Sequence, residues 1–215
     1  MFAVFDGFGG DDISNFCSEN ATEALEKTTP TLSIRQRIQQ TLNSLIEQLQ
    51  VKKGAMEKIG TTACLCLKNK EEICIANIGD SGAMILKKNG NLRRITTEHS
   101  VENKNELARI EKLGGVLLNG GGKIRLQGEL SITRAIGSTS LHPYLSEEAE
   151  YIEPTLEEED AYIILGSDGI LKHLGDKIDS PIRKSPLEIA NKIQEIAVLN
   201  GSKDNTTVVA IELIV

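Results

Sequence analysis

Four short patterns typical of β-strands follow one another between residues 62 and 95, and no helical pattern separates them. They cover residues 62–67, 73–78, 83–86 and 92–95, and the pair Asn89-Gly90 is a strong hairpin signal before the last of them. Strands that come in runs, without regular alternation with helices, are typical of α+β domains. The chain is therefore predicted to contain an antiparallel meander, and a doubly wound parallel sheet is disfavoured.

Helical patterns lie on both sides of this meander. Apolar residues recur at helical spacing between residues 13 and 25, and again after Ser33, which forms a capping box with Gln36. Two more helices are predicted over residues 102–113, before Gly114, and over 187–197, before Gly201. Further strands are predicted at residues 2–5, 116–118, 123–126, 161–165 and 206–215, with an irregular acidic stretch around 147–159.

No internal repeat or convincing linker divides the chain. At roughly 150 residues per domain, the 215 residues allow one large domain or two small ones. We therefore predict a single α+β domain over residues 1–215.

Composition narrows the class of partner and the location. The chain carries 31 acidic and 24 basic side chains, which gives a net charge of −7, and it has no basic cluster. This charge argues against nucleic acid as a binding partner. No apolar stretch approaches the roughly 18 residues of a membrane span, so a cytoplasmic or nuclear location is expected. Four cysteines, at 17, 64, 66 and 74, lie in apolar segments and are expected to be free and buried. A metal site at Cys64 and Cys66 is disfavoured by their spacing.

Aspartates recur beside glycines or small residues at the ends of apolar strands. Asp6, Asp80 and Asp168 each end such a run, and Asp204 precedes the last strand. Each one alone is readily explained as a solvated turn residue. Together they predict a shared site, because clustered carboxylates repel one another unless a hard cation lies among them. Oxygen-only ligands favour Mg or Mn over zinc or copper.

Seven motifs in order resemble those of the type-2C, metal-dependent protein serine/threonine phosphatases. They are VFDGFGG (4–10), GTTA (60–63), ANIGDSGAMI (76–85), ELARIEKLGGVL (106–117), GELSITRAIGS (128–138), IILGSDGI (163–170) and GSKDNTTVVAI (201–211). The resemblance covers nearly the whole chain. It implies a four-layer sandwich in which helix pairs flank two stacked antiparallel sheets, with a two-metal site at one end.

The resemblance also implies roles for particular residues. Asp6 matches the aspartate that bridges both metals, Gly7 a backbone-carbonyl ligand of one of them, and Asp168 and Asp204 ligands of the other. In this family a water held between two Mg or Mn ions attacks the phosphorus. Asp80 matches an acid that helps to hold a third ion, and a simple turn aspartate is the alternative.

Several positions depart from the family pattern. Phe8 stands where the family has a histidine thought to protonate the leaving oxygen, and Lys172 stands where a further acid is usual, which puts the third ion in doubt. Gly137-Ser138 replaces a common Gly-Asp. Before the first motif the family has strands that carry a phosphate-binding arginine and an acidic pair. The chain begins too close to Asp6 to include these strands, so the domain is expected to lack them.

Other residues offer partial substitutes for these losses. Arg125, Arg134 or Arg183 would have to supply the phosphate contact, although a solvated or ion-paired arginine is the simpler interpretation of each. A replacement acid would have to come from a histidine, and the chain has three, at positions 99, 142 and 173.

Two functions follow from the resemblance and its breaks. The first is metal-dependent hydrolysis of phosphoserine and phosphothreonine in proteins, with reduced activity. The alternative is a catalytically inactive pseudophosphatase that acts as a protein-binding or regulatory module. The partner is accordingly a phosphoprotein substrate or a regulated protein. The acidic residues around 147–159 would suit a basic partner, although a solvated loop is the simpler interpretation of them.

Overall fold

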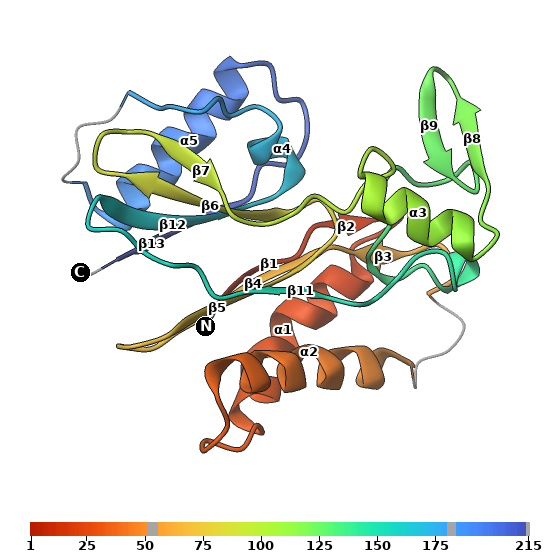
Figure 1. Ribbon diagram of the computed structural model, residues 1–215, viewed down its shortest axis with the longest axis horizontal. Helices are drawn as coiled ribbons and strands as arrows, with labels where there is room; N and C mark the ends of the chain where they lie inside the picture. Colours follow the sequence, from red (N-terminus) through yellow and green to blue (C-terminus); the bar gives the residue numbers. More distant parts are fainter. Residues whose placement is uncertain (51–55, 180–183, 214–215) are drawn as a thin grey trace.

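Two antiparallel sheets stacked face to face form the centre of the protein (Figure 1). The computed structural model describes residues 1–50, 56–179 and 184–213. The first sheet has the order β1 (Phe2–Val4), β4 (Ala63–Lys68), β5 (Ile73–Ile78) and β11 (Glu150–Ile152). The second has the order β13 (Val208–Glu212), β12 (Asp160–Gly166), β6 (Gly82–Lys87) and β7 (Leu92–Arg94). A small sheet of β10 (Ile136–Gly137), β3 (Gly60–Thr61) and β2 (Gly7–Phe8) adjoins them.

The alternation of side chains along β12 shows how the layers are held together. Ile163 and Leu165 point into the core between the two sheets, whereas Tyr162 and Ile164 belong to the cluster under the outer helix. Successive side chains of a strand point to opposite faces, so a continuously apolar strand must be covered on both. All seven residues of β12 are buried, which fits a strand inside a layered sandwich.

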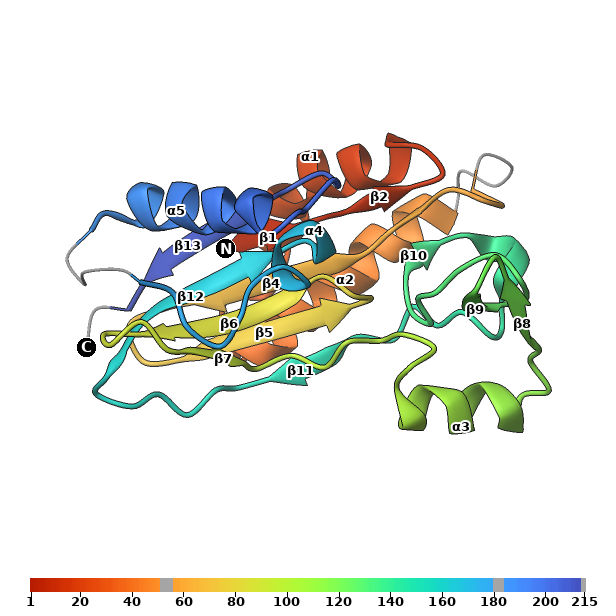
Figure 2. The ribbon, with the colours of Figure 1, turned by 90° about the horizontal axis from the view of Figure 1, so that it is seen from above.

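Helices cover the outer faces of both sheets (Figures 1 and 2). The helices α1 (Asp12–Glu26) and α2 (Ile34–Gln50) pack on the first sheet through a core that includes Ile38, Leu42 and Leu65. The helix α5 (Pro186–Leu199) covers the second sheet through Ile189 and Ile193, with the single turn α4 (Asp168–Leu171) beside it.

The predicted capping box determines where α2 begins. Ser33 Oγ accepts a hydrogen bond from the Gln36 backbone N–H at 3.2 Å, and the Gln36 side chain accepts one from the Ser33 N–H at 3.1 Å. Two backbone donors that the helix itself cannot satisfy are thereby paired.

A smaller unit projects beyond one end of the sandwich (Figure 1). It consists of α3 (Lys104–Lys112) and the hairpin of β8 (Leu117–Gly120) and β9 (Lys123–Leu126). The hairpin turns at Gly121 and Gly122, both with positive φ, so the run of three glycines at 120–122 forms a tight turn. The short 3-10 turn η1 (Thr139–Leu141) follows β10.

The structure confirms the predicted α+β class with mainly antiparallel sheets and corrects some local boundaries. The stretch around 147–159, expected to be irregular, contains β11, which pairs with β5. The last strand begins at Val208 instead of residue 206, and residues 214–215 lie outside the described ranges. All four cysteines are free and buried, as expected. Within the described ranges, no helix has both the length and the apolar character that crossing a bilayer requires.

Candidate metal centre

Asp6 follows β1, where the chain leaves the first sheet. Its backbone accepts a hydrogen bond from the Thr62 N–H at 2.9 Å, and its own N–H donates to Thr62 Oγ1 at 3.3 Å. The next residue, Gly7, pairs with Thr61 in the small sheet. A Cβ at Gly7 would come within 2.6 Å of Ser14 Oγ at the start of α1 and 3.0 Å of the Gly10 carbonyl oxygen, so this close approach of chain segments favours glycine.

Asp168 and Asp204 come from the same end of the second sheet. Asp168 begins α4 just after β12, and Asp204 precedes β13, which pairs with β12 in antiparallel register from Gly166 and Val208 onward. Between them lies Gly169, where a Cβ would collide with the backbone carbonyl of Asn205 and lie 3.2 Å from Asp204 Cβ. The absence of a side chain at this position lets the two aspartates approach each other.

Asp80 lies in the connection that passes from β5 of the first sheet to β6 of the second. It is buried, with 8% of its surface exposed. Ser81, the next residue, is hydrogen-bonded to Thr62 through their hydroxyls at 2.6 Å, which ties this connection to the segment that also holds Asp6.

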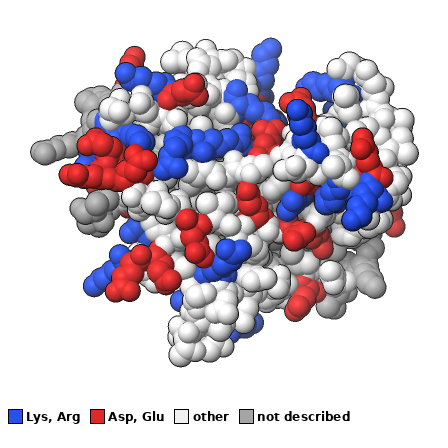
Figure 3. Space-filling view, in the orientation of Figure 1, with Lys and Arg blue, Asp and Glu red and all other residues white. Residues whose placement is uncertain are grey.

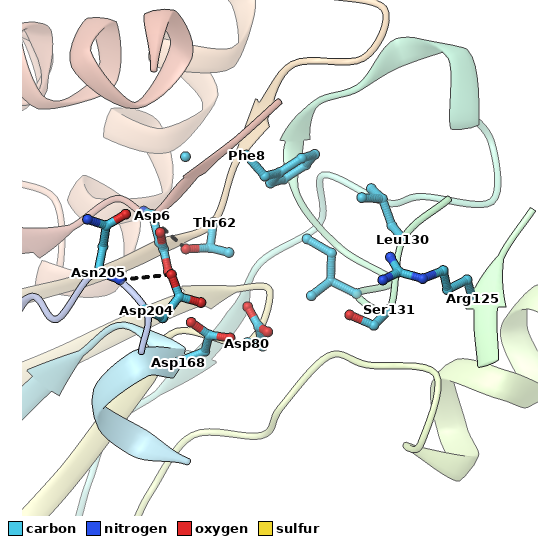
Figure 4. A pocket seen from close by; sticks show the side chains of 12 residues that line it. Asp6, Phe8, Thr62, Asp80, Arg125, Leu130, Ser131, Asp168, Asp204 and Asn205 are labelled. Atoms are coloured by element: carbon cyan, nitrogen blue, oxygen red, sulfur yellow. Dashed lines mark hydrogen bonds between the residues drawn. The ribbon is translucent and has the colours of Figure 1, made fainter. Parts of the chain in front are cut away.

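These segments enclose a pocket of about 270 Å³ at the end of the sandwich (Figure 4). The four aspartates form one side of the pocket, and Phe8, Leu130 and Arg125 lie on the other. The residues that line it are Asp6, Gly7, Phe8, Thr62, Asp80, Arg125, Leu130, Ser131, Ile132, Asp168, Asp204 and Asn205. The predicted ligand residues Asp6, Gly7, Asp168 and Asp204 are therefore brought together, and Asp80 joins them. Their role as ligands stays a prediction.

The aspartates affect one another electrostatically. Burial raises the pKa of Asp6 to about 7, together with the charges of Asp168, Asp80 and Asp204 and a hydrogen bond with the Asp168 carboxylate. Like charges this close disfavour the ionised form of each group. A cation among these carboxylates would remove that penalty.

One cation is already present at the edge of this cluster. Lys172 Nζ lies 2.9 Å from Asp80 Oδ2 and 2.8 Å from Asp168 Oδ2. Burial by itself would lower the pKa of Lys172, but the two carboxylates outweigh burial and raise it, so the ammonium stays charged.

The donor set fits a hard divalent cation in its chemistry. The pocket offers four carboxylates, and oxygen donors of this kind are the ligands of Mg and Mn. Within the described ranges, however, no three His, Cys, Asp or Glu side chains are arranged so that they could hold an ion as they stand. Ion binding would therefore have to draw the carboxylates closer around the metal.

None of the three histidines lines the pocket, so none supplies the general acid that is missing at Phe8. His99 is buried, and its Nδ1 accepts a hydrogen bond from the Gly79 N–H at 3.2 Å. Burial lowers the pKa of His99 to about 4, so its ring is neutral near pH 7. Phe8, which does line the pocket, offers no exchangeable proton.

The three arginines considered for phosphate binding differ in position. Arg125 lines the pocket. Arg134 is instead ion-paired with the buried carboxylate of Glu106, with a 3.0 Å hydrogen bond from its Nε. Arg183 lies outside the described residues.

Sequence reasoning did not single out several residues that the structure adds to the pocket. Asn205 follows Asp204 directly, and its N–H donates to Asp204 Oδ1 at 2.8 Å. Leu130, Ser131 and Ile132 come from the segment after β9. The only sequence signal for them was that they lie within the motif at 128–138. Thr62 had a comparable signal, since it lies within the motif GTTA.

The fold of two stacked antiparallel sheets is shared with solved structures, among them a phosphatase. A phosphatase from a pathogenic strain of Toxoplasma gondii superposes with a TM-score of 0.72 at 20% identity, covering 99% of this chain and 88% of that one. The structure of a Caenorhabditis elegans sex-determining protein gives a TM-score of 0.82 at 28% identity, covering 98% of this chain and 55% of that one.

The sequence identifies the family within this class. Residues 1–206 match the model of the protein phosphatase 2C family, and the chain belongs to that family. The chain is 30% identical to a probable mitochondrial protein phosphatase 2C (member 13) of Oryza sativa and 29% identical to the protein phosphatase fem-2 of Caenorhabditis elegans, over 99% and 97% of its own length. It spans 59% and 50% of the lengths of those two relatives.

Proposed function

We propose that this protein hydrolyses phosphoserine and phosphothreonine in proteins with the help of two Mg or Mn ions, at a reduced rate. The observation that carries the proposal is the meeting of Asp6, Asp168 and Asp204 in one pocket, from sequence positions far apart. Membership of the protein phosphatase 2C family supports the reaction class.

Some residues of the pocket would bind the ions, and another would bind the substrate. Asp6, Asp168, Asp204 and the carbonyl of Gly7 would hold the ions. When bound, the ions would supply Lewis acidity, which lowers the pKa of water and neutralises charge on the phosphoryl oxygens. Arg125 is the one cationic side chain among the described residues that line the pocket, so it is the candidate for attracting the phosphate.

The step that these residues support poorly is protonation of the leaving oxygen. Phe8 lines the pocket and has no proton to give, and the loss of a positioned general acid costs about 10²–10⁴ in rate. The loss is smallest when the leaving group is stable as an anion. An aryl phosphate should therefore be hydrolysed faster than a phosphothreonine peptide.

A second candidate function is that of a pseudophosphatase, which would bind or regulate another protein without catalysis. The ion pairs of Lys172 with Asp80 and Asp168 favour it, because they occupy carboxylate oxygens that a metal would need. Phe8 favours it for the reason given above.

Turnover assays separate the two candidates. The purified protein is incubated with Mn²⁺ and either an aryl phosphate or a phosphothreonine peptide, alongside Asp168→Asn. Hydrolysis of the aryl phosphate that Asp168→Asn abolishes supports the enzyme. Absence of Asp168-dependent turnover on either substrate eliminates it and leaves the binding module, whose interaction with a partner protein should survive Asp168→Asn.

A further inference from the structure

The ammonium group of Lys172 joins two parts of the acidic pocket. Its Nζ contacts Asp168 Oδ2 at 2.8 Å within α4 and the turn that ends it, and Asp80 Oδ2 at 2.9 Å across 92 residues of sequence. The contact with Asp168 has the i,i+4 spacing of an ordinary helical ion pair. The contact with Asp80 has no such local origin, so folding itself places this cation between two carboxylates from different segments.

The burial of Asp80 makes this cation more than a surface charge. The Asp80 side chain is 10% exposed, against 43% for Lys172. Among the described residues, Lys172 is the one side chain that donates a hydrogen bond to the Asp80 carboxylate. A buried carboxylate without a partner is strongly destabilising, so the position of Lys172 meets a requirement that a metal ion between the same two oxygens would also meet.

We propose that Lys172 is a tethered cation that takes the place of a divalent ion between Asp80 and Asp168. The chain then binds one ion fewer than its carboxylates would otherwise hold, and its remaining ions bind less tightly because one oxygen of Asp168 is already engaged. This inference rests on the proposed function in so far as Asp168 is taken to be a metal ligand.

Electrostatics sets the direction of the effects. An ammonium group is a compact point charge, and it repels a divalent ion held by the same carboxylate. Without metal the same charge keeps Asp80 and Asp168 from repelling each other. Removal of the charge should therefore weaken the metal-free protein and strengthen metal binding at the same time, a combination that loss of an ordinary surface ion pair would not produce.

Metal titration and thermal unfolding of Lys172→Met test the proposal without any turnover measurement. Binding of Mn²⁺ is measured by calorimetry, and unfolding is followed in EDTA and in Mn²⁺. We expect the Mn²⁺ dissociation constant to fall about tenfold or more. The Tm in EDTA should fall by about 3–6 °C, and Mn²⁺ should restore it. Lys177→Met, an exposed lysine outside the pocket, is the matched control and should change neither quantity.

A second variant reports on the number of ions. Lys172→Asp adds a carboxylate where the ammonium stood and should bind one Mn²⁺ more than the wild type. If circular dichroism shows that this variant does not fold, the Lys172→Met comparison decides the matter alone. If the wild type and Lys172→Met bind Mn²⁺ with the same affinity and show the same Tm response, the inference is overturned, whereas the metal centre itself stands. Absence of Mn²⁺ binding to the folded wild type would overturn both.

Discussion

Phe8 forms part of the apolar side of the pocket, facing the aspartates (Figure 4). It is half-buried in β2 and packs against the cluster that contains Ile110, Leu126 and Ile132. Its ring also closely approaches Gly60 in the neighbouring strand, where a Cβ would collide with it. The side chain thus contributes to packing at a position where a proton donor would be useful.

Replacement of this ring by an ionisable one should therefore change substrate preference. We expect Phe8→His to raise turnover of a phosphothreonine peptide roughly tenfold to a hundredfold, with little change on an aryl phosphate, because only the alkoxide leaving group needs the proton. The ratio of kcat/KM for the two substrates is the measurement. Phe8→Leu, which changes the packing without adding an acid, is the control. Equal gains on both substrates would contradict an acid role.

At the scale of elements, the buried carboxylate of Glu106 connects α3 to the segment that lines the pocket. Glu106 is 3% exposed and accepts hydrogen bonds from Thr133 Oγ1 at 2.9 Å, Arg109 Nη2 at 3.1 Å and Arg134 Nε at 3.0 Å. The segment from Ser131 to Arg134 carries two pocket residues. Glu106 therefore holds that side of the pocket in position through its hydrogen bonds with Thr133 and Arg134.

Removal of its charge should destabilise the protein near neutral pH. Burial alone would raise the pKa of Glu106, but Arg134, Thr133 and Arg109 outweigh burial and lower it to about 2 from a model-compound value of 4.5. The stabilisation is thus fully present above about pH 4.5 and is lost as the pH falls toward 2. We expect Glu106→Gln to lower the free energy of unfolding by about 2 kcal/mol at pH 7.

Urea unfolding at several pH values checks this prediction for Glu106. The difference between wild type and Glu106→Gln should shrink as the pH falls from about 4.5 toward 2, because the carboxylate of the unfolded wild type becomes protonated in this range while the native carboxylate stays ionised. Glu111→Gln, on the exposed side of α3, should leave the free energy of unfolding nearly unchanged. A difference that is independent of pH would show that charge is not what Glu106 contributes.

The start of α5 depends on a second capping box. Ser185 Oγ accepts a hydrogen bond from the Glu188 N–H at 3.3 Å, and Glu188 Oε2 accepts one from the Ser185 N–H at 2.8 Å. Ser185→Ala should cost about 1 kcal/mol in the free energy of unfolding, measured by thermal or urea denaturation. The exposed Ser18→Ala within α1 should cost nothing, and equal effects of the two substitutions would refute the capping role.

The long elements were predictable because their own residues carry the period. Ile34, Ile38 and Leu42 define the buried face of α2, and the unbroken apolar run of β12 marks a strand covered on both faces. The short elements β2, β3, β10 and β11 have two or three residues each, too few to show a period. They are strands only because distant segments pair with them, as β5 does with β11.

At the scale of the whole molecule, the candidate site lies where the two sheets meet. Asp6 follows a strand of the first sheet, Asp168 and Asp204 flank strands of the second, and Asp80 lies in the connection between the sheets. Sequence motifs predicted which aspartates gather. They did not predict the pairing of Lys172 with Asp80, because no local pattern reports a contact across 92 residues. The sequence indicates only that Lys172 stands where an acid is usual, and the structure shows its ammonium group ion-paired with two of the carboxylates.

A metal ion at this position would raise the free energy of unfolding of the whole domain. An ion held by Asp6 and Asp168 would link the two sheets. It would also offset the burial and the carboxylate repulsion that together raise the pKa of Asp6 to about 7. A ligand that binds only the folded state stabilises it by about 2.7 kcal/mol at a hundred times its dissociation constant. We expect Mn²⁺ at that excess to raise the free energy of unfolding by this amount and EDTA to reverse the gain.

Urea denaturation with and without Mn²⁺ measures this gain, and Asp204→Asn supplies the comparison. Loss of one ligand should weaken the response to Mn²⁺, whereas the metal-free variant should be at least as stable as the wild type, because one of the mutually repelling charges is gone. The same response in both proteins would mean that Mn²⁺ stabilises the fold from somewhere other than this pocket. A response that disappears in Asp204→Asn would locate the ion where the two sheets meet.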